Sequence, residues 1–315
     1  MMSDLSTTLC LFVAEDQQAW ADAFRRAIPG LDIRLWPDRP DAGTSYVVAA
    51  WTPPDGFFAV LDRAQAVFVL GAGIDRFLQR TDQPAPEVPV IRLADAGMAA
   101  QMAEFALAGV LRFQRNLDHY EAQQAACRWR PLPARAAGET RVAVLGLGRI
   151  GGHVAATLAG LGYKVSGWSR SQAAIAGVHC LAGRKVLPAL LGETDILVNI
   201  LPSTPDTRGL LGRDMLSRLP KGAAIINGGR GDQLDCEALR DLLDEGHLRG
   251  ACLDVFPDEP LPVDHPLWRH PAVRITPHVA AITLIEPAVA QIAASLRRLG
   301  RGEPVEGRVD RSRGY

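Results

Sequence analysis

The fold is decided by residues 141–159, which read RVAVLGLGRIGGHVAATLA. The apolar run at its start predicts a short buried strand, the glycines predict a tight turn, and apolar residues at helical spacing follow. A strand, a glycine-rich turn and a helix in this order set a helix N-terminus against the turn, where unpaired N–H groups and the helix dipole favour an anion. The segment predicts a dinucleotide pyrophosphate site formed by Gly146, Gly148, Arg149, Ile150 and Gly151. The alternative is a tight turn that needs glycine only for steric reasons.

Apolar runs and helical patterns alternate on both sides of this segment, which predicts an α/β class of parallel sheets covered by helices. The runs from residue 141 onward predict one doubly wound sheet, with strands at 141–145, 164–168, 179–181, 196–201, 223–227, 250–255 and 273–276. The earlier runs predict a second, smaller sheet, with strands at 9–13, 32–35, 46–50, 66–70 and 90–93.

A last helix follows the second sheet. Thr283 and Glu286 have the spacing of a capping box, Pro287 falls in the first turn, and Gly300 marks the end. Because this helix follows the whole second sheet, it can return to the first domain. We expect domains at 1–97 with 282–315 and at 98–281.

Composition narrows the class of protein. With 315 residues the chain exceeds what one core usually supports, so two domains are expected. Its 34 basic and 35 acidic residues are balanced, which argues against a nucleic-acid partner. No stretch is apolar enough to span a membrane. The five cysteines form no Cys-x-x-Cys pair, which favours reduced thiols in a cytoplasmic protein and no metal site.

The second strand of the nucleotide unit indicates which dinucleotide binds. NAD-preferring folds usually carry an acidic residue at its end, for the ribose hydroxyls. No carboxylate occurs from residue 141 to 192, and the expected position reads Ser169, Arg170, Ser171. A guanidinium and two hydroxyls suit a 2′-phosphate, so we expect NADPH to be preferred over NADH. The alternative is that Arg170 is a solvated surface residue.

Three chemically distinct groups follow later apolar runs. Arg230 follows 223–227, Glu259 follows 250–255, and His278 follows 273–276. In open α/β folds the carboxyl ends of the strands bind ligands, so we expect the three side chains to converge. A guanidinium, a carboxylate and an imidazole beside a dinucleotide are the groups needed to reduce a 2-oxo acid.

These segments, together with LPSTPDTRG at 201–209, resemble the D-isomer-specific 2-hydroxyacid dehydrogenases. The resemblance extends over most of the chain and is dense from 141 to 281. LGAGID at 70–75 resembles that family's substrate loop, and Trp51, Gly97-Met98 and the C-terminal end resemble its glyoxylate and hydroxypyruvate reductase A branch. The resemblance implies a flavodoxin-like substrate domain, a Rossmann domain, NADPH as cofactor and a small 2-oxo acid as substrate.

The resemblance also implies roles for residues. His278 would protonate the carbonyl oxygen of the substrate, Glu259 would orient the imidazole, and Arg230 would anchor the substrate carboxylate. Glu259 is preferred to the adjacent Asp258 because it precedes Pro260-Leu261, as in the family. The cofactor would also contact Leu201, Pro202, Thr207, Gly228 and Asp254, the last orienting the nicotinamide amide. The substrate would also contact Trp51, Ala72 and Gly73, although Trp51 is equally consistent with a core position.

Two other functions remain open on the sequence. A dinucleotide sensor resembling the corepressors that share this scaffold would use NADPH only to switch a protein interface. A reductase of another class, acting on imines or 3-hydroxy acids, needs a lysine or another acid that the sequence does not place. The aromatic and polar stretch at 117–133 resembles an arm that packs on a second subunit, so we expect a homodimer. Site residues on both domains imply a cleft that closes on its ligand.

Overall fold

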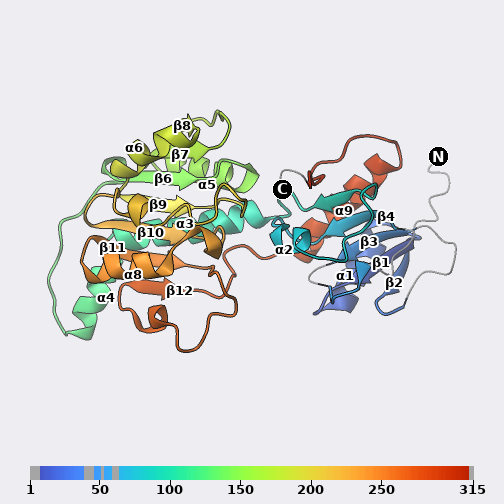
Figure 1. Cartoon of the computed structure of the whole chain (residues 1–315), viewed down its shortest axis with the longest axis horizontal. Coiled ribbons are helices and arrows are strands. Elements are labelled where there is room, and N and C mark those ends of the chain that lie inside the picture. Colours follow the sequence, from blue (N-terminus) through green and yellow to red (C-terminus); the bar gives the residue numbers. More distant parts are fainter. Residues whose placement is uncertain (1–7, 39–45, 51–52, 59–63, 312–315) are drawn as a thin grey trace. The chain divides into compact units, whose positions relative to one another are not determined.

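The computed structural model describes residues 8–38, 46–50, 53–58 and 64–311 (Figure 1). The chain divides into two compact units, Met1–Gly97 with Thr283–Tyr315 and Met98–Ile282. Among the described residues, no helix combines the length and the apolar character needed to cross a bilayer.

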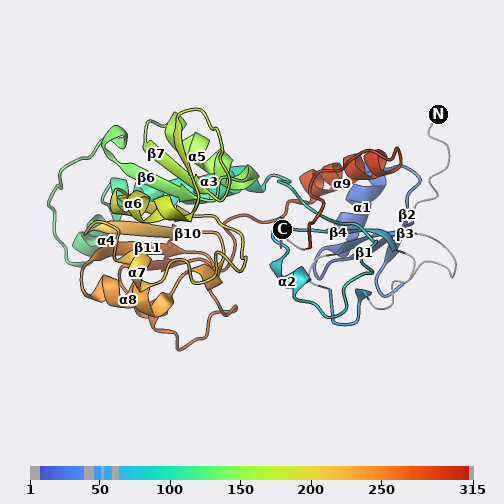
Figure 2. The same ribbon diagram turned by 45° about the horizontal axis from the view of Figure 1, so that its top comes forward.

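The first unit contains a five-stranded parallel sheet in the order β2-β1-β3-β4-β5. This is the flavodoxin-like order, with its switch point between β1 and β3. Its strands are β1 Thr8–Phe12, β2 Asp32–Leu35, β3 Tyr46–Ala50, β4 Ala64–Val69 and β5 Val90–Arg92. Its helices are α1 Gln17–Ala27, α2 Asp75–Leu78 and α9 Ile285–Leu299. Helices α1 and α9 pack against each other, so the last helix of the chain completes the unit in which the chain begins (Figure 2).

The second unit contains a seven-stranded parallel sheet in the order β12-β11-β10-β9-β6-β7-β8. The order reverses between β6 and β9, and this switch point is where doubly wound sheets bind nucleotides. Its strands are β6 Arg141–Leu145, β7 Lys164–Ser169, β8 Val178–Ala182, β9 Ile196–Asn199, β10 Ala223–Asn227, β11 Leu248–Leu253 and β12 Val273–Ile275. Its helices are α3 Met98–Gln114, α4 Leu117–Ala125, α5 Arg149–Gly160, α6 Leu187–Gly192, α7 Arg213–Leu216 and α8 Cys236–Asp244. Four 3-10 turns complete it: η2 Ala137–Glu139, η3 Arg184–Val186, η4 Gly231–Gln233 and η5 Pro266–Arg269.

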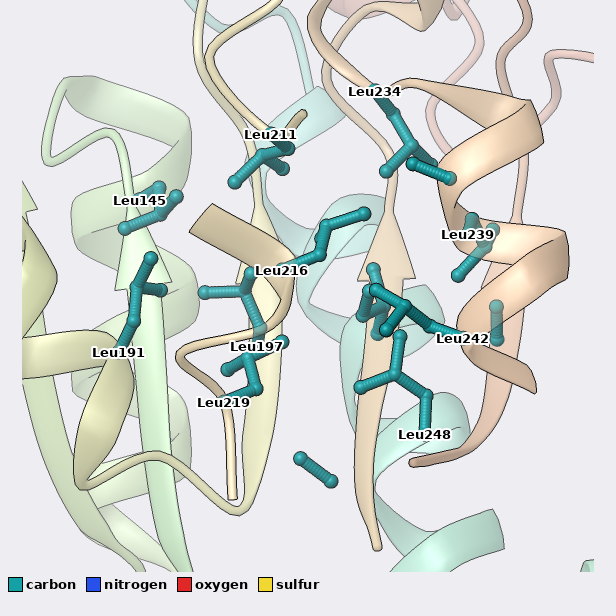
Figure 3. Packing of buried hydrophobic residues seen from close by; sticks show 14 of the residues in the cluster. Leu145, Leu191, Leu197, Leu211, Leu216, Leu219, Leu234, Leu239, Leu242 and Leu248 are labelled. Carbon is teal, nitrogen blue, oxygen red and sulfur yellow. The ribbon is translucent and has the colours of Figure 1, made fainter. Parts of the chain in front are cut away.

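Side chains alternate between the two faces of this sheet. In β6, Val142 and Val144 pack with α3 and α5, whereas Ala143 and Leu145 pack with the opposite helices α6, α7 and α8. Figure 3 shows leucines of the core that contains Leu145, on the α6, α7 and α8 side of the sheet, between strands and helices. Both faces are buried, which explains why these strands read as continuous apolar runs. The predicted fold class, two doubly wound parallel α/β sheets, is confirmed.

The capping box predicted for the last helix was wrong. Helix α9 begins at Ile285 with Leu284 as its N-cap, and no side chain caps it. The hydroxyl of Thr283 donates to the carbonyl of Leu70 at 2.9 Å, and Glu286 pairs with Arg26 of α1. Both side chains therefore make tertiary contacts within the first unit in place of the local cap.

Candidate active site

The three glycines after β6 meet three different requirements. Gly146 has a φ of +99°, and a Cβ there would lie 2.7 Å from the carbonyl oxygen of Ile200. A Cβ on Gly151 would lie 1.9 Å from the oxygen of Gly146, so only glycine lets α5 pack this close to the strand. A Cβ on Gly148 would meet no atom within 4 Å. Gly148 therefore leaves open space at the helix start, which is what a backbone needs to approach a pyrophosphate.

Helix α5 begins at this open position. Gly148 is its N-cap and has no side chain that could cap it, Arg149 is exposed, and Ile150 is half-buried. A helix N-terminus with open space before it and no acidic residue in its first turn fits an anion. The residues predicted for the pyrophosphate thus form one turn.

The end of β7 lies beside that turn. The amide of Gly146 donates to the carbonyl of Trp168 at 2.8 Å, which joins the glycine turn to β7. The strand ends at Ser169, whose hydroxyl donates to the carbonyl of Ser171 at 2.7 Å, while Arg170 and Ser171 are exposed. The structure therefore places Ser169, Arg170 and Ser171 next to the glycine turn, where a dinucleotide ribose lies in this fold.

The loop after β9 carries the next predicted cofactor residues. Leu201 and Thr207 are buried and Pro202 is exposed. The hydroxyl of Thr207 donates to the carbonyl of Pro202 at 2.7 Å and accepts from the amide of Thr204 at 2.9 Å. In this structure Thr207 thus stabilises the turn that presents Pro202.

Arg230 lies on the turn after β10. The amide of Gly228 donates to the carbonyl of Asn199 at 3.1 Å, so the turn begins against β9. A Cβ on Gly231 would lie 1.9 Å from the carbonyl carbon of Phe256, which shows that the turn also packs directly on the segment after β11. Arg230 is half-buried, and its Nη1 donates to the carbonyl of Gly229 at 2.8 Å.

Glu259 and His278 form a hydrogen-bonded pair. Nδ1 of His278 and Oε2 of Glu259 are 2.8 Å apart, and Oε1 of Glu259 accepts from the amide of Phe256 at 3.1 Å. The carboxylate bond to Nδ1 leaves Nε2 as the ring nitrogen for exchange with a substrate. The side chain of Glu259 is 18% exposed and that of His278 43%, so the imidazole is the accessible member of the pair. The segment that contacts Arg230's turn through Phe256 therefore also holds the imidazole.

Asp254 has a role that its sequence position did not reveal. Its side chain is almost fully buried and accepts from the hydroxyl of Thr276 at 2.6 Å and the amides of Val279 and Ala280 at 2.9 Å. Its backbone oxygen accepts from the amide of His278 at 2.9 Å. His278 itself has a φ of +58°, a conformation that a non-glycine residue keeps only when its surroundings enforce it. Asp254 fixes the turn that carries the imidazole.

The cysteines and the possible metal ligands of the protein were the other candidates for chemistry. None of the five cysteines, all within the described residues, forms a disulfide, and burial raises the pKa of Cys252 on β11 and of Cys236 on α8 to about 11. Neither thiol is a nucleophile near neutral pH. Within the described parts of the chain, no group of three or more His, Cys, Asp or Glu side chains could hold a metal ion.

Two further predicted substrate residues, Ala72 and Gly73, belong to the first unit. Ala72 and Gly73 are half-buried in the loop between β4 and α2, and Nη1 of Arg92 donates to the carbonyl of Ala72 at 3.4 Å. Trp51 lies outside the described residues. After it, Arg80 holds Pro53 and Pro54 by donating to their carbonyls at 2.8 and 2.7 Å. The contacts of Arg80 and Arg92 could not be predicted from the sequence, because a lone arginine gives no pattern that identifies its partner.

Comparison with known proteins places these features in a family. The family described as "D-isomer specific 2-hydroxyacid dehydrogenase, NAD binding domain" matches residues 107–280. That range contains the glycine turn, Arg230, Glu259 and His278.

Solved structures match over nearly the whole length. A D-isomer specific 2-hydroxyacid dehydrogenase from Xanthobacter autotrophicus Py2, in complex with NADPH and MES, is 43% identical with a TM-score of 0.94, over 98% of this chain and 100% of that one. An NADPH-dependent glyoxylate/hydroxypyruvate reductase from Sinorhizobium meliloti, in complex with NADP and sulfate, is 32% identical with a TM-score of 0.91, over 98% and 100%. A family member from Klebsiella pneumoniae 342 is 37% identical with a TM-score of 0.86, over 99% and 100%. With its nucleotide turn and its paired imidazole and carboxylate, this chain belongs to the D-isomer specific 2-hydroxyacid dehydrogenase family of NAD(P)-dependent oxidoreductases.

Proposed function

We propose that this protein reduces small 2-oxo acids, glyoxylate and hydroxypyruvate foremost, to 2-hydroxy acids with NADPH. The observation that carries the proposal is the pair formed by Nδ1 of His278 and Oε2 of Glu259, 2.8 Å apart, in the unit that holds the nucleotide turn. An accessible imidazole oriented by a carboxylate is a general acid for a carbonyl oxygen.

Each residue contributes a distinct physical step. Bound NADPH supplies the hydride that reduces the carbonyl carbon. Nε2 of His278 donates a proton to the carbonyl oxygen, while Glu259 holds the ring and stabilises its positive charge. The guanidinium of Arg230 binds the substrate carboxylate and orients the carbonyl for attack.

The cofactor preference rests on the end of β7. Ser169, Arg170 and Ser171 offer hydroxyls and a guanidinium where an NAD-preferring fold offers a carboxylate. We therefore assign NADPH over NADH. Relatives were solved with NADPH or NADP, which supports the assignment.

The substrate class rests on the Arg230 anchor and on the first unit. We propose that the loop bearing Ala72 and Gly73 binds the substrate carboxylate through backbone N–H groups, with Trp51 as a further contact. The Sinorhizobium meliloti relative, 32% identical, is named for glyoxylate and hydroxypyruvate, which supports a small substrate.

We also propose a homodimer in the cytoplasm. Helix α4 buries none of its residues, and Trp129, which follows it, is fully exposed. An unburied helix next to an exposed tryptophan offers a surface that a second subunit can cover. The absence of disulfides among the five cysteines, all of them described, is consistent with a reducing compartment. Light scattering that shows a monomer at micromolar concentration would refute the dimer.

The function is tested by the loss of NADPH absorbance with a panel of 2-oxo acids, each assayed with NADPH and with NADH. We expect glyoxylate and hydroxypyruvate to be reduced fastest, with NADPH favoured. A protein that binds NADPH but oxidises it with no member of the panel would contradict the proposal and favour the alternative of a dinucleotide sensor.

A further inference from the structure

Three buried amide side chains join the turn of Arg230, the proposed substrate anchor, to the loop of Leu201 and Pro202, which are expected to contact the cofactor. Asn199 ends β9, Asn227 ends the adjacent β10, and Gln233 lies in η4, just after Arg230. Each is 0% exposed. A buried amide is costly unless it is hydrogen-bonded, so the arrangement of these groups depends on their partners.

Both donors and both acceptor positions of the Gln233 side chain are used in hydrogen bonds to these loops and to Asn199. Its Nε2 donates to the carbonyls of Leu201 at 3.1 Å and Pro202 at 2.7 Å. Its Oε1 accepts from the amide of Arg230 at 3.3 Å and from Nδ2 of Asn199 at 2.6 Å. The orientation of the amide is unambiguous, because a flipped side chain would set its oxygen against two carbonyls and its NH₂ group against two donors.

The two asparagines complete the network. Nδ2 of Asn199 also donates to Oδ1 of Asn227 at 2.9 Å. Oδ1 of Asn227 accepts in addition from the amide of Gly229 at 3.1 Å, and its Nδ2 donates to the carbonyl of Arg230 at 3.3 Å. Both backbone groups of Arg230 are therefore bonded to the network. Each side-chain nitrogen and oxygen of the three amides has a hydrogen-bond partner, and a buried network of this kind rigidifies what it connects.

Direct packing sets the same spacing independently. A Cβ on Gly229 would lie 3.0 Å from both the nitrogen and the oxygen of Leu201, and 3.1 Å from Nδ2 of Asn199. The turn before Arg230 and the loop before Pro202 are thus already in close contact. A change in either hydrogen bonding or volume at this point moves one loop relative to the other.

We propose that Gln233 is a positioning residue for the reaction, holding the turn of Arg230 at a fixed distance from the Leu201–Pro202 loop. The inference rests on the proposed function, in which Arg230 anchors the substrate, and on the contact with the cofactor that the family resemblance implies for Pro202. A shift between these loops displaces the carbonyl carbon from the hydride donor. NADPH affinity changes little, because residues 146–151 and 169–171, which Gln233 does not contact, hold the rest of the cofactor.

Gln233→Met tests the hydrogen bonds, because methionine keeps the length of the side chain but donates nothing. We expect kcat/KM for glyoxylate to fall about 30- to 100-fold. The dissociation constant of NADPH should stay within about threefold of that of the wild type, and the deuterium isotope effect on kcat should rise as hydride transfer becomes rate-limiting. Thr194→Val is the matched control, since it removes a buried hydroxyl that donates to the carbonyl of Leu190 at 2.7 Å, and its kinetics should match the wild type.

Gly229→Ala tests the same spacing without removing a hydrogen bond and remains informative should Gln233→Met fail to fold. We expect the same selective loss of kcat/KM with a raised isotope effect. The inference is overturned if either folded variant reduces glyoxylate within about threefold of the wild type, or if both lose NADPH affinity in proportion to activity. A wild-type protein that reduces no oxo acid would instead refute the proposed function itself.

Discussion

The imidazole of His278 is fixed from two sides by acidic residues. Glu259 binds Nδ1 of the ring. Asp254 binds the backbone amides of His278 and of the two residues that follow it, Val279 and Ala280. These contacts hold a non-glycine residue at a φ of +58°, so ring and backbone are constrained together. Such preorganisation keeps the proposed proton donor in one orientation before the substrate arrives.

Replacing His278 by Asn separates the proton donor from the backbone strain, because asparagine tolerates positive φ. We expect kcat for glyoxylate reduction to fall about 10²- to 10⁴-fold, the usual contribution of a general acid. NADPH binding, followed by fluorescence titration, should be unchanged. A loss of less than about fivefold would show that the imidazole does not donate the proton.

Ser169→Asp places a carboxylate where the proposal places the 2′-phosphate. Because like charges repel, the ratio of kcat/KM with NADPH to that with NADH should fall by at least about tenfold. Steady-state kinetics with both cofactors measure the ratio. Ser217→Asp, at an exposed serine after α7, is the control and should leave the ratio unaltered. If Ser169→Asp behaves like the control, the end of β7 does not select the cofactor.

At the residue scale, the sequence predicted the contact between Glu259 and His278 but not the contacts that hold the turns around it. Arg230, Glu259 and His278 were found because each follows an apolar run in a family-like segment. The bonds of Asp254 to residues 276–280 and the contacts of Gln233 could not be found, because they depend on which loops the sheet order brings together. The sequence assigned Gln233 no role, since one glutamine after a turn usually lies in solvent.

At the scale of elements, periodicity predicted the strands and the end of α9 at Gly300, but it missed helix α4 and the N-terminal cap of α9. Each predicted strand occurs, most within one or two residues of its expected bounds, because a buried parallel strand is a plain apolar run. Helix α4 was not predicted, since it buries no residue and so has no apolar stripe. The predicted cap of α9 failed because Thr283 and Glu286 found partners elsewhere in their unit.

Alanine substitution at two glycines of the nucleotide turn and at one glycine at the end of α5 separates binding from stability. Gly151→Ala should destabilise the fold and abolish NADPH binding, since its Cβ would lie 1.9 Å from the oxygen of Gly146. Gly148→Ala should leave the melting temperature unchanged but weaken NADPH binding, because open space surrounds it in the protein alone. Gly160→Ala, at the end of the same helix and also in open space, should stabilise by about 0.5–1 kcal/mol.

Thermal melts and NADPH titrations of the three variants provide the check. A Gly148→Ala protein that binds NADPH as tightly as the wild type would show that the pyrophosphate does not lie at this turn. A Gly151→Ala protein as stable as the wild type would show that the close approach of α5 to β6 is not required.

At the scale of the whole molecule, acid stability should depend on Glu121 of α4. Its carboxylate is paired with Arg112 of α3 and Arg274 of β12, and the hydrogen bond to Arg112 is the main reason why its pKa falls from 4.5 to about 2. A lowered folded-state pKa stabilises the fold above the unfolded value, and this contribution is lost as the pH falls through the folded value. Glu121→Gln should therefore be less stable than the wild type at pH 7, and the difference should vanish between pH 4.5 and about 2.

Denaturant unfolding at several pH values measures this difference. We expect it to be ~1 kcal/mol or less at pH 7, since the Glu121 side chain is 44% exposed and solvent screens the pair. A difference that is constant from pH 7 to pH 2 would show that packing, and not charge, holds α4.

The two sheets of the molecule were predictable because the chain alternates strand and helix patterns throughout. The order of the strands was not, since parallel strands carry no mark of their neighbours. It is the reversal between β6 and β9 that sets the glycine turn beside the loop at Leu201, as shown by the close approach of Gly146 to Ile200. The site therefore depends on topology as much as on motifs.

In the proposed reaction, hydride passes from NADPH to a 2-oxo acid while His278 supplies the proton. The most direct measurement incubates the protein with glyoxylate and NADPH deuterated at the transferred position, and follows deuterium in the product by mass spectrometry. We predict glycolate with one deuterium from the wild type and almost none from His278→Asn in the same time. Glycolate without deuterium, or equal labelling by the two proteins, would contradict this reaction.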